Sequence, residues 1–375
     1  MKKAIWWVVG IIIVVVLIVV VINSNSSNSG PIKIGLIAPL TGDGAPYGDS
    51  LKGAADLALK EINSVGGING RQVQFITEDS KCTGKDAATA AQKLISIDKV
   101  KYIIGLPCSG EVLGVLPISD PAKVILMVQG SNPAITATGH YVFRTFPNDL
   151  LSSQTIAKHA INNGFKTAAV ITENTDYSVG MEKAFTDAYE SLGGNVADSE
   201  KYQSDATDFR SILTKIKALS PAMIFINAQV GANAARIAEQ ARQLGIKSQF
   251  YTAFFSGDDF VKSSPAVNGT YVVDLPVLNS SSTEAVAFSS AYRAANGGDP
   301  AYPFFAAGAY DETNILAQAL KNVGTDDTDT VWNYLHGLHS YTGVVGTFHF
   351  DNKGDVVGVL PLMKKVVNNT IITVN

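Results

Sequence analysis

The most constraining feature of this sequence is a pair of apolar runs within residues 101–133, each ended by small polar residues. Residues 102–106 are followed by Pro-Cys-Ser-Gly, and residues 124–128 by Gln-Gly-Ser-Asn-Pro, with a mostly apolar helical segment between them. Such runs predict parallel strands that are buried on both faces of a sheet. Neighbouring parallel strands end at one edge of the sheet, where open α/β sheets bind ligands. We therefore expect Ser109 and Ser131 to bring hydroxyl groups into one crevice.

Alternating strand and helix patterns continue through most of the chain in two series. The first predicts strands at 32–39, 73–77, 102–106 and 124–128, with helices at 51–65 and 85–97. The second predicts helices at 153–163, 178–192, 207–219 and 232–244, with strands at 168–172, 195–198, 222–227, 249–254 and 271–275. Helical segments follow at 283–296, 303–323 and 329–338, before a β-rich tail at 346–374.

Two such series predict an α/β chain with two Rossmann-like lobes and a ligand cleft between them. We expect lobe 1 to comprise residues 31–146 and 277–348, and lobe 2 residues 147–276 and 349–375. The β character of the tail differs from both series, so it is expected to return between the lobes without forming a third domain.

Residues 1–30 differ from the rest of the chain. Lys2 and Lys3 precede an unbroken apolar segment at 4–22, which as a helix would span roughly 28 Å, close to the hydrocarbon core of a bilayer. The lysines are expected to stay in the cytoplasm. An uncleaved signal anchor is favoured over a cleaved signal peptide, because no small-residue cleavage site follows. Residues 23–30 would then be a flexible tether.

Composition narrows the possible partners. With 46% hydrophobic and 17% charged residues, 375 residues are enough for two domains with real cores, and a net charge of -4 gives no basic surface for nucleic acid. Cys82 and Cys108 are the two cysteines. In an exported chain they favour one disulfide over a redox or metal pair, with two unrelated buried thiols as the alternative.

Catalytic motifs are missing from the sequence: it has no GxSxG, GxGxxG, P-loop or HExxH pattern. His336, His339 and His349 have no carboxylate or cysteine at matching spacing, so packing is the better interpretation and we expect no metal and no cofactor. Asp258 and Asp259 form an adjacent carboxylate pair, for which a solvated loop is the simpler interpretation.

Two tyrosines carry a weak binding signal. Tyr47 follows the first predicted strand, at the same sheet edge as Ser109 and Ser131, and Tyr177 follows a strand of the second series. Their rings could cover a small ligand from opposite lobes. Helix-start packing explains either tyrosine equally well. Hydroxyls, amides and rings that converge in this way suit a polar zwitterion or a similar solute.

From about residue 32 to the C-terminus, the chain resembles the leucine/isoleucine/valine-binding proteins, the type I periplasmic solute-binding family of branched-chain amino acid ABC importers. The resemblance rests on these segments: IGLIAPLTGDGAPYGDSLKGAADLALKEINSVGGING, EDSKCTGKDAATAAQKL, YIIGLPCSG, ILMVQGSNPAIT, FRTFP, DYSVGMEKAF, QARQLGI, AYDETNILAQAL and GVVGTFHFDNKGD. Together they are specific to the family, although not to a ligand.

The resemblance implies two lobes joined by three crossings, with closure of the cleft around a solute. It also implies a disulfide between Cys82 and Cys108. By residue-to-residue match, Ser109 and Ser131 would hold the ligand carboxylate, and the Gly130 carbonyl would accept from the ligand ammonium. Tyr47 and Tyr177 would be aromatic walls. Permease and ATPase subunits are the implied partners.

One position departs from the family pattern. Where the amino-acid binders place an acidic residue that pairs with the ligand ammonium, this chain has Phe254. A buried, unpaired ammonium costs several kcal/mol. Either Asp258 or Asp259 reaches in from the following loop, or the ligand is an amide, a short carboxylate or an aromatic acid. We keep a branched-chain or similar amino acid as the first expectation.

Three functions are compatible with these features. The first is the extracytoplasmic solute-binding component of an ABC importer, anchored to the cytoplasmic membrane by its N-terminal helix, or secreted or periplasmic if the signal is cleaved. The second is a ligand-sensing ectodomain that acts through a partner. An enzyme ranks third, because no reacting group is recognisable.

Overall fold

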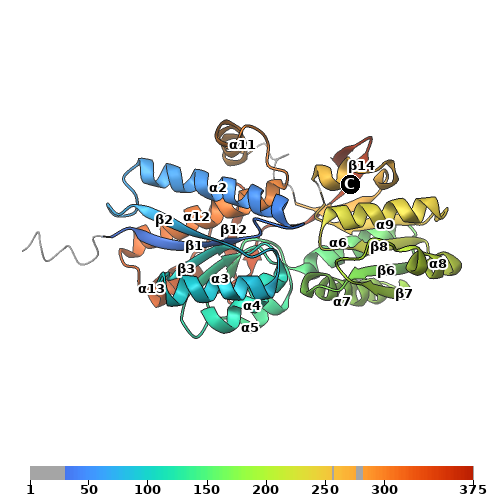
Figure 1. The fold of residues 1–375 in the computed structure, drawn as a ribbon, viewed down its shortest axis with the longest axis horizontal. Coiled ribbons are helices and arrows are strands. Elements are labelled where there is room, and N and C mark those ends of the chain that lie inside the picture. Colours follow the sequence, from blue (N-terminus) through green and yellow to red (C-terminus); the bar gives the residue numbers. More distant parts are fainter. Residues whose placement is uncertain (1–29, 256, 276–281, 375) are drawn as a thin grey trace, which may run out of the picture.

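The computed structural model describes residues 30–255, 257–275 and 282–374. Two sheets lie one after the other along the long axis of the molecule, and helices cover both faces of each (Figure 1). We call the part built on the five-stranded sheet the first lobe and the part built on the seven-stranded sheet the second lobe.

All neighbouring strands in the sheet of the first lobe are parallel, in the order β2-β1-β3-β4-β5. Their bounds are β1 Ile32–Ala38, β2 Val73–Asp79, β3 Tyr102–Gly105, β4 Ile125–Val128 and β5 Val142–Arg144. One face packs against α2 (Ala45–Ser64), α11 (Thr283–Asn296), α12 (Pro303–Val323) and α13 (Thr328–His336). The other face packs against α3 (Gly84–Ser96), α4 (Ser109–Ser119) and α5 (Ala134–Thr138).

The sheet of the second lobe is mixed, in the order β15-β14-β10-β9-β8-β6-β7. Its parallel strands are β6 Thr167–Glu173, β7 Asn195–Tyr202, β8 Met223–Asn227, β9 Gln249–Ala253 and β10 Tyr271–Asp274. Its antiparallel edge consists of β14 Leu362–Val367 and β15 Thr370–Thr373. Cores form against α6 (Asp149–Asn162) and α7 (Asp176–Ser191) on one face, and α8 (Arg210–Leu219), α9 (Gly231–Gln243) and α10 (Asp258–Val261) on the other.

The chain crosses between the lobes after β5, after β10 and before β14. A small sheet, β11 Tyr341–Gly343, β12 Gly346–Phe350 and β13 Val356–Val357, precedes the last crossing. Phe350 and Val356 are buried in a core of the first lobe. The return to the second lobe therefore comes after β13, later than the predicted boundary at residue 349. The division of the chain into two domains with the other predicted boundaries stays a prediction.

Local signals explain where the predicted elements shift. The helix expected at 153–163 begins at Asp149, because Asn148 caps it and its side chain accepts from the Leu150 amide at 2.7 Å. The short strand β5 was not predicted, since three residues are too few for a periodic pattern. β7 extends to Tyr202, beyond the predicted end at residue 198. It is a half-exposed edge strand, and the polar residues at its exposed positions interrupt the apolar pattern from which a strand is predicted.

Two glycines let α3 and α4 pack closely. A side chain at Gly114 would bring its Cβ to 2.5 Å from the carbonyl oxygen of Gly84, and one at Gly84 would come to 2.7 Å from that of Gly110. Both neighbours are backbone atoms and cannot rotate away. The pair holds α4, whose first residue is Ser109, against α3.

The membrane-spanning helix predicted at residues 4–22 lies outside the described residues. Within the described part of the chain, no helix is both long and apolar enough to cross a bilayer.

Gly114→Ala is expected to lower the free energy of unfolding by about 1–3 kcal/mol, because the added methyl group forces α3 and α4 apart. Gly298→Ala is the matched control, since its Cβ would meet no atom within 4 Å. That control should stay within about 0.5 kcal/mol of the parent. Urea unfolding followed by circular dichroism measures both variants, and equal losses would contradict the packing argument.

Candidate functional site

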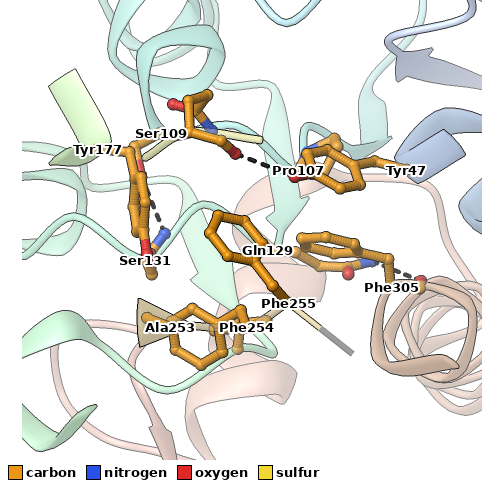
Figure 2. A pocket seen from close by; sticks show the side chains of 12 residues that line it. Tyr47, Pro107, Ser109, Gln129, Ser131, Tyr177, Ala253, Phe254, Phe255 and Phe305 are labelled. Atoms are coloured by element: carbon orange, nitrogen blue, oxygen red, sulfur yellow. Dashed lines mark hydrogen bonds between the residues drawn. The ribbon is translucent and has the colours of Figure 1, made fainter. Parts of the chain in front are cut away.

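An aromatic pocket lies between the lobes, at the carboxyl ends of strands from both sheets. Figure 2 shows Tyr177 and Ser131 on one side of it, with Tyr47 and Phe305 on the other. The lining residues are Tyr47, Pro107, Ser109, Gln129, Ser131, Phe146, Tyr177, Gln229, Ala253, Phe254, Phe255 and Phe305. Most follow directly on β3, β4, β5, β6, β8 or β9, so the position agrees with the rule for ligands in open α/β sheets.

Five predicted residues meet in this pocket: Tyr47, Ser109, Ser131, Tyr177 and Phe254. The two tyrosines lie in the first turns of α2 and α7, one from each lobe, and both are buried. The convergence that was expected from separate loops is therefore present in the structure.

Hydrogen bonds within the protein decide whether the Ser109 hydroxyl can donate to a ligand or accept from it. Its Oγ accepts hydrogen bonds from the amides of Ser131 at 3.2 Å and Asn132 at 3.1 Å. A hydroxyl offers one hydrogen and two lone pairs, and both lone pairs are now used. Ser109 can therefore only donate to a ligand in the pocket, which suits a carboxylate oxygen.

Arg144 holds the loop that carries Ser131. Its guanidinium is fully buried and all five N–H groups are used. Nη1 donates to the carbonyls of Gly130 at 3.3 Å and Asn132 at 2.9 Å, and Nη2 to Thr136 Oγ1 at 3.1 Å. Nε donates to Asp355 Oδ1 at 2.8 Å, and Nη2 also pairs with this carboxylate.

The role expected of Gly130 stays a prediction. Its carbonyl, predicted to accept from a ligand ammonium, accepts from Arg144 Nη1 at 3.3 Å, and Gly130 is not among the described residues that line the pocket. A side chain at this position would meet Val112, Ile135 and the Ser109 Cα at about 3 Å, so the loop packs tightly onto α4.

Phenylalanines form the apolar wall. Phe146 contacts Phe254 edge-on with ring centres 4.6 Å apart, and lies 5.9 Å from the ring of Phe305. Phe254 has a left-handed backbone with φ of 61°, which is rare for a bulky residue. Strain of this kind persists where the surrounding structure enforces it, and here it aims the end of β9 at the pocket.

The two candidate ammonium partners lie away from the pocket lining. The Asp258 side chain is 74% exposed and pairs with Lys262 at 2.9 Å. Both oxygens of Asp259 lie 2.6 Å from the Tyr302 hydroxyl, which donates to this carboxylate. Burial raises the pKa of Asp259 and the Tyr302 hydrogen bond lowers it. Neither carboxylate lines the pocket, and both begin the short helix α10 instead of a solvated loop.

Several hydrogen bonds link the two lobes around the pocket. The Tyr47 hydroxyl donates to the Gln229 carbonyl at 3.0 Å, Asn132 Nδ2 donates to the Asp176 carbonyl at 2.7 Å, and Tyr302 donates to Asp259. The pocket has a volume of about 30 Å³, room for about two water molecules. A solute the size of an amino acid therefore enters only if the lobes separate or the lining rings move.

The predicted disulfide between Cys82 and Cys108 is present, with Cα atoms 5.5 Å apart. Glu111 lies behind it, fully buried, and accepts from the Cys108 amide at 2.8 Å and from the Ser80 hydroxyl. Burial raises the pKa of Glu111 to about 7, against the lowering effect of the Ser80 hydrogen bond. The hydrogen bond from the Cys108 amide to Glu111 and the disulfide together fix the position of Cys108, which directly precedes Ser109.

The sequence did not single out several residues that shape the site, namely Gln129, Phe146, Phe305, Arg144 and Asp149. Phe146 and Arg144 belong to the FRTFP segment, which was noted as a crossing but not as part of the site. An arginine within an otherwise apolar strand end was the available signal, because arginine is rarely buried without partners.

The structure places the three histidines His336, His339 and His349 apart from any cluster of metal-ligating atoms among the described residues. Among the described residues, the group with metal-ligating atoms close together is Cys82, Cys108 and Glu111, whose sulfurs are joined in the disulfide. The His336 ring instead packs against Phe143 at 4.8 Å and Trp332 at 4.1 Å.

Comparison with known proteins identifies the family. Residues 31–367 match the family described as periplasmic binding protein. The chain belongs to this family. Over 333 residues it is 27% identical to the leucine-, isoleucine-, valine-, threonine- and alanine-binding protein of Pseudomonas aeruginosa, covering 87% of each chain. This family of periplasmic binding proteins binds solutes outside the cytoplasm, in agreement with the predicted class of function.

Solved structures share the fold. The substrate-binding protein of a branched-chain amino acid transporter from Streptococcus pneumoniae, in complex with isoleucine, superposes with a TM-score of 0.82 at 27% identity, covering 92% of this chain and 100% of that chain. A solute-binding protein of an ABC transporter from R. palustris, in complex with benzoate, superposes with a TM-score of 0.83 at 22% identity, covering 92% and 96%.

Buried carboxylates make the stability of this periplasmic binding protein depend on pH. A carboxyl with a raised folded-state pKa contributes stability that is complete below its unfolded pKa and is lost as the pH rises through the folded value. For Glu111 that window runs from 4.5 to about 7. Carboxylates whose folded-state pKa is lowered, such as Asp79, have the opposite effect. The stability that they contribute to the fold is lost only as the pH falls through their lowered pKa.

The free energy of unfolding is therefore expected to be higher at pH 5 than at pH 8, with on the order of 2 kcal/mol of the difference from Glu111. Glu111→Gln should reduce this difference, because the amide cannot ionise. Urea unfolding at the two pH values measures the effect. An unchanged pH dependence in the variant would show that Glu111 is not its source.

Proposed function

We propose that this chain is the solute-binding component of an ABC importer and binds a small amino acid, branched-chain or similar, in the pocket between its lobes. The single observation that carries the proposal is the Ser109 hydroxyl, which can only donate, placed against a wall of phenylalanine rings. One polar anchor and an apolar surface suit a solute with a carboxylate and a hydrophobic body.

Two relatives support an amino acid as the ligand. The Pseudomonas aeruginosa protein is named for leucine, isoleucine, valine, threonine and alanine, and the Streptococcus pneumoniae protein holds isoleucine. The branched side chain would lie against Phe146, Phe254 and Phe305, and Tyr47 and Tyr177 would cover the ligand from the two lobes.

An aromatic or short carboxylic acid, or an amide, is the second candidate ligand. The pocket is lined by four phenylalanines and two tyrosines, and its described lining residues include no charged side chain. Offset and edge-on ring contacts suit an aromatic body. The same fold holds benzoate in the R. palustris protein.

The importer role implies permease and ATPase subunits as partners. We also propose that residues 4–22 anchor the chain at the outer face of the cytoplasmic membrane. Cell fractionation followed by N-terminal sequencing tests this arrangement: an intact N-terminus in the membrane fraction is expected, and a soluble chain that begins near residue 30 would show cleavage. A ligand-sensing ectodomain remains the alternative role for the same site.

The ligand class is tested by thermal unfolding in the presence of candidate solutes. Leucine, isoleucine or valine is expected to raise the melting temperature, because a ligand that binds only the folded state stabilises it by mass action. Benzoate and uncharged amides serve as the competing probes. A shift with benzoate or an amide, and none with the three amino acids, would replace the first ligand class by the second.

Ser109→Ala is expected to weaken binding of the carboxylate ligand by about 10-fold to 100-fold, because a hydrogen bond to a charged group is lost. Titration calorimetry measures the affinity. Ser191→Ala, an exposed serine in the last turn of α7, is the control and should bind as the parent does. Equal affinities of the Ser109 variant and the parent would remove Ser109 from the site.

A further inference from the structure

Gln129 brings a polar atom without a partner to the wall of the pocket. The residue directly follows β4, lines the pocket and is 1% exposed, yet its side-chain oxygen Oε1 has no hydrogen-bond partner among the described residues. Buried polar atoms are normally satisfied, so a buried acceptor that the described chain leaves open calls for an explanation. The function proposed above gives Gln129 no role.

The nitrogen of the Gln129 amide fixes which way the amide faces. Nε2 donates to the Phe305 carbonyl at 3.2 Å, a bond that Figure 2 marks with a dashed line. Burial raises the pKa of Glu312 well above its usual range, and the Gln129 side chain is among the groups that lower it, as an N–H group that faces a carboxyl does. Turning the amide over would set Oε1 against the Phe305 carbonyl oxygen, and neither oxygen can donate. Oε1 therefore stays an open acceptor.

The Gln129 amide is also held against α12. A Cβ at Gly308 would lie 2.9 Å from Cδ, 3.0 Å from Oε1 and 3.1 Å from Nε2 of Gln129, so the whole amide packs onto the backbone of this helix. Glu312, one turn further along α12, is buried and accepts from the Gly105 amide at 3.1 Å and the Thr145 hydroxyl at 2.8 Å. The helix thus positions Gln129 from behind, and the pocket lies in front of it.

Gln129 and the two serines lie on different sides of the pocket. Figure 2 shows Ser109 and Ser131 on the left, with the Gln129 amide next to Phe305 on the right. A ligand whose carboxylate is held by Ser109 therefore extends its body toward Gln129. In an α-amino acid the ammonium shares one carbon with the carboxylate, so the group that meets Oε1 belongs to the ligand body and not to its ammonium.

We propose that Gln129 is a specificity-determining residue, whose Oε1 accepts a hydrogen bond from a hydroxyl or amide N–H group on the body of the ligand. The inference rests on the proposed function and deepens it, because it selects, among small carboxylates, those that carry such a donor. A purely apolar body leaves Oε1 unpaired and cut off from water, and a body of the same shape with a donor satisfies it.

Two pairs of solutes with nearly equal shape test this preference on the unmodified full-length chain, purified in detergent micelles. Threonine has a hydroxyl where valine has a methyl group, and 4-hydroxybenzoate adds a hydroxyl to benzoate. One pair probes a pocket for amino acids and the other a pocket for aromatic acids. In titration calorimetry, the hydroxyl-bearing member of the pair that binds is expected to have at least about 10-fold higher affinity.

Gln129→Met is the test variant, because methionine keeps the length of the side chain and removes both polar atoms. The preference should disappear: threonine should bind no more tightly than valine, and 4-hydroxybenzoate no more tightly than benzoate. The ratio of the two affinities is the readout, since a general loss of folding or of closure weakens both members of a pair alike. If the variant does not fold, the ratio measured on the unmodified chain decides.

Gln243→Met is the matched control. Gln243 is exposed at the end of α9 and bonds to Glu239 of the same helix, away from the pocket lining. The control should keep the affinity ratio of the parent chain within about threefold.

Three results would overturn the inference: equal or weaker binding of the hydroxyl-bearing solute by the parent chain, a preference that survives in Gln129→Met, or a preference that Gln243→Met loses as well. In each of them the chain still binds a carboxylate, so the proposed function stands without the inference. Binding of leucine but of neither pair would also overturn the inference alone. Binding of none of these solutes would contradict the proposed ligand classes as well.

Discussion

The site depends on one buried guanidinium. Arg144 ends the last strand of the first sheet, and its five N–H groups connect the Ser131 loop, the start of α5 and the segment before the final crossing. Removing the hydrogen-bond partners of Arg144 would strongly destabilise the fold, because a buried charge without hydrogen bonds does not regain the free energy of hydration that it lost on burial. The loop that presents Ser131 is therefore positioned before any solute arrives, because the carbonyls of Gly130 and Asn132 on either side of Ser131 both accept from Arg144.

The hydrogen bonds within these loops determine what the hydroxyls of Ser109 and Ser131 can offer a ligand. Two serines on neighbouring loops look equivalent in sequence, yet Ser109 has both lone pairs occupied by the Ser131 and Asn132 amides, whereas the Ser131 hydroxyl lies beside the buried carboxyl of Asp149 and lowers its pKa. Direction is thus imposed on the ligand by backbone amides and not by charges in the pocket wall. A solute with a hydrogen-bond acceptor at one end and a donor at the other would fit in one orientation.

Much of the fold could be predicted from the sequence, because apolar runs and turn residues report local structure directly. The strands before Ser109 and Ser131, the disulfide and the aromatic positions Tyr47 and Tyr177 followed from such patterns or from the family resemblance. The partners of Arg144 and the burial of Asp149 could not be predicted, since they depend on contacts with Asp355 and Ser131 that only the folded chain brings together. Asp259 shows the same limit, because Tyr302 from the other lobe decides where it points.

The bonds across the cleft have a consequence for the medium in which the protein works. Tyr47 and Asn132 reach across from neutral side chains to backbone carbonyls. Dissolved ions screen attractions between charges, and they have little effect on neutral hydrogen bonds of this kind. The closed arrangement is therefore largely insensitive to ionic strength at these two points, which suits a chain that operates outside the cytoplasm, where the cell does not control the salt concentration.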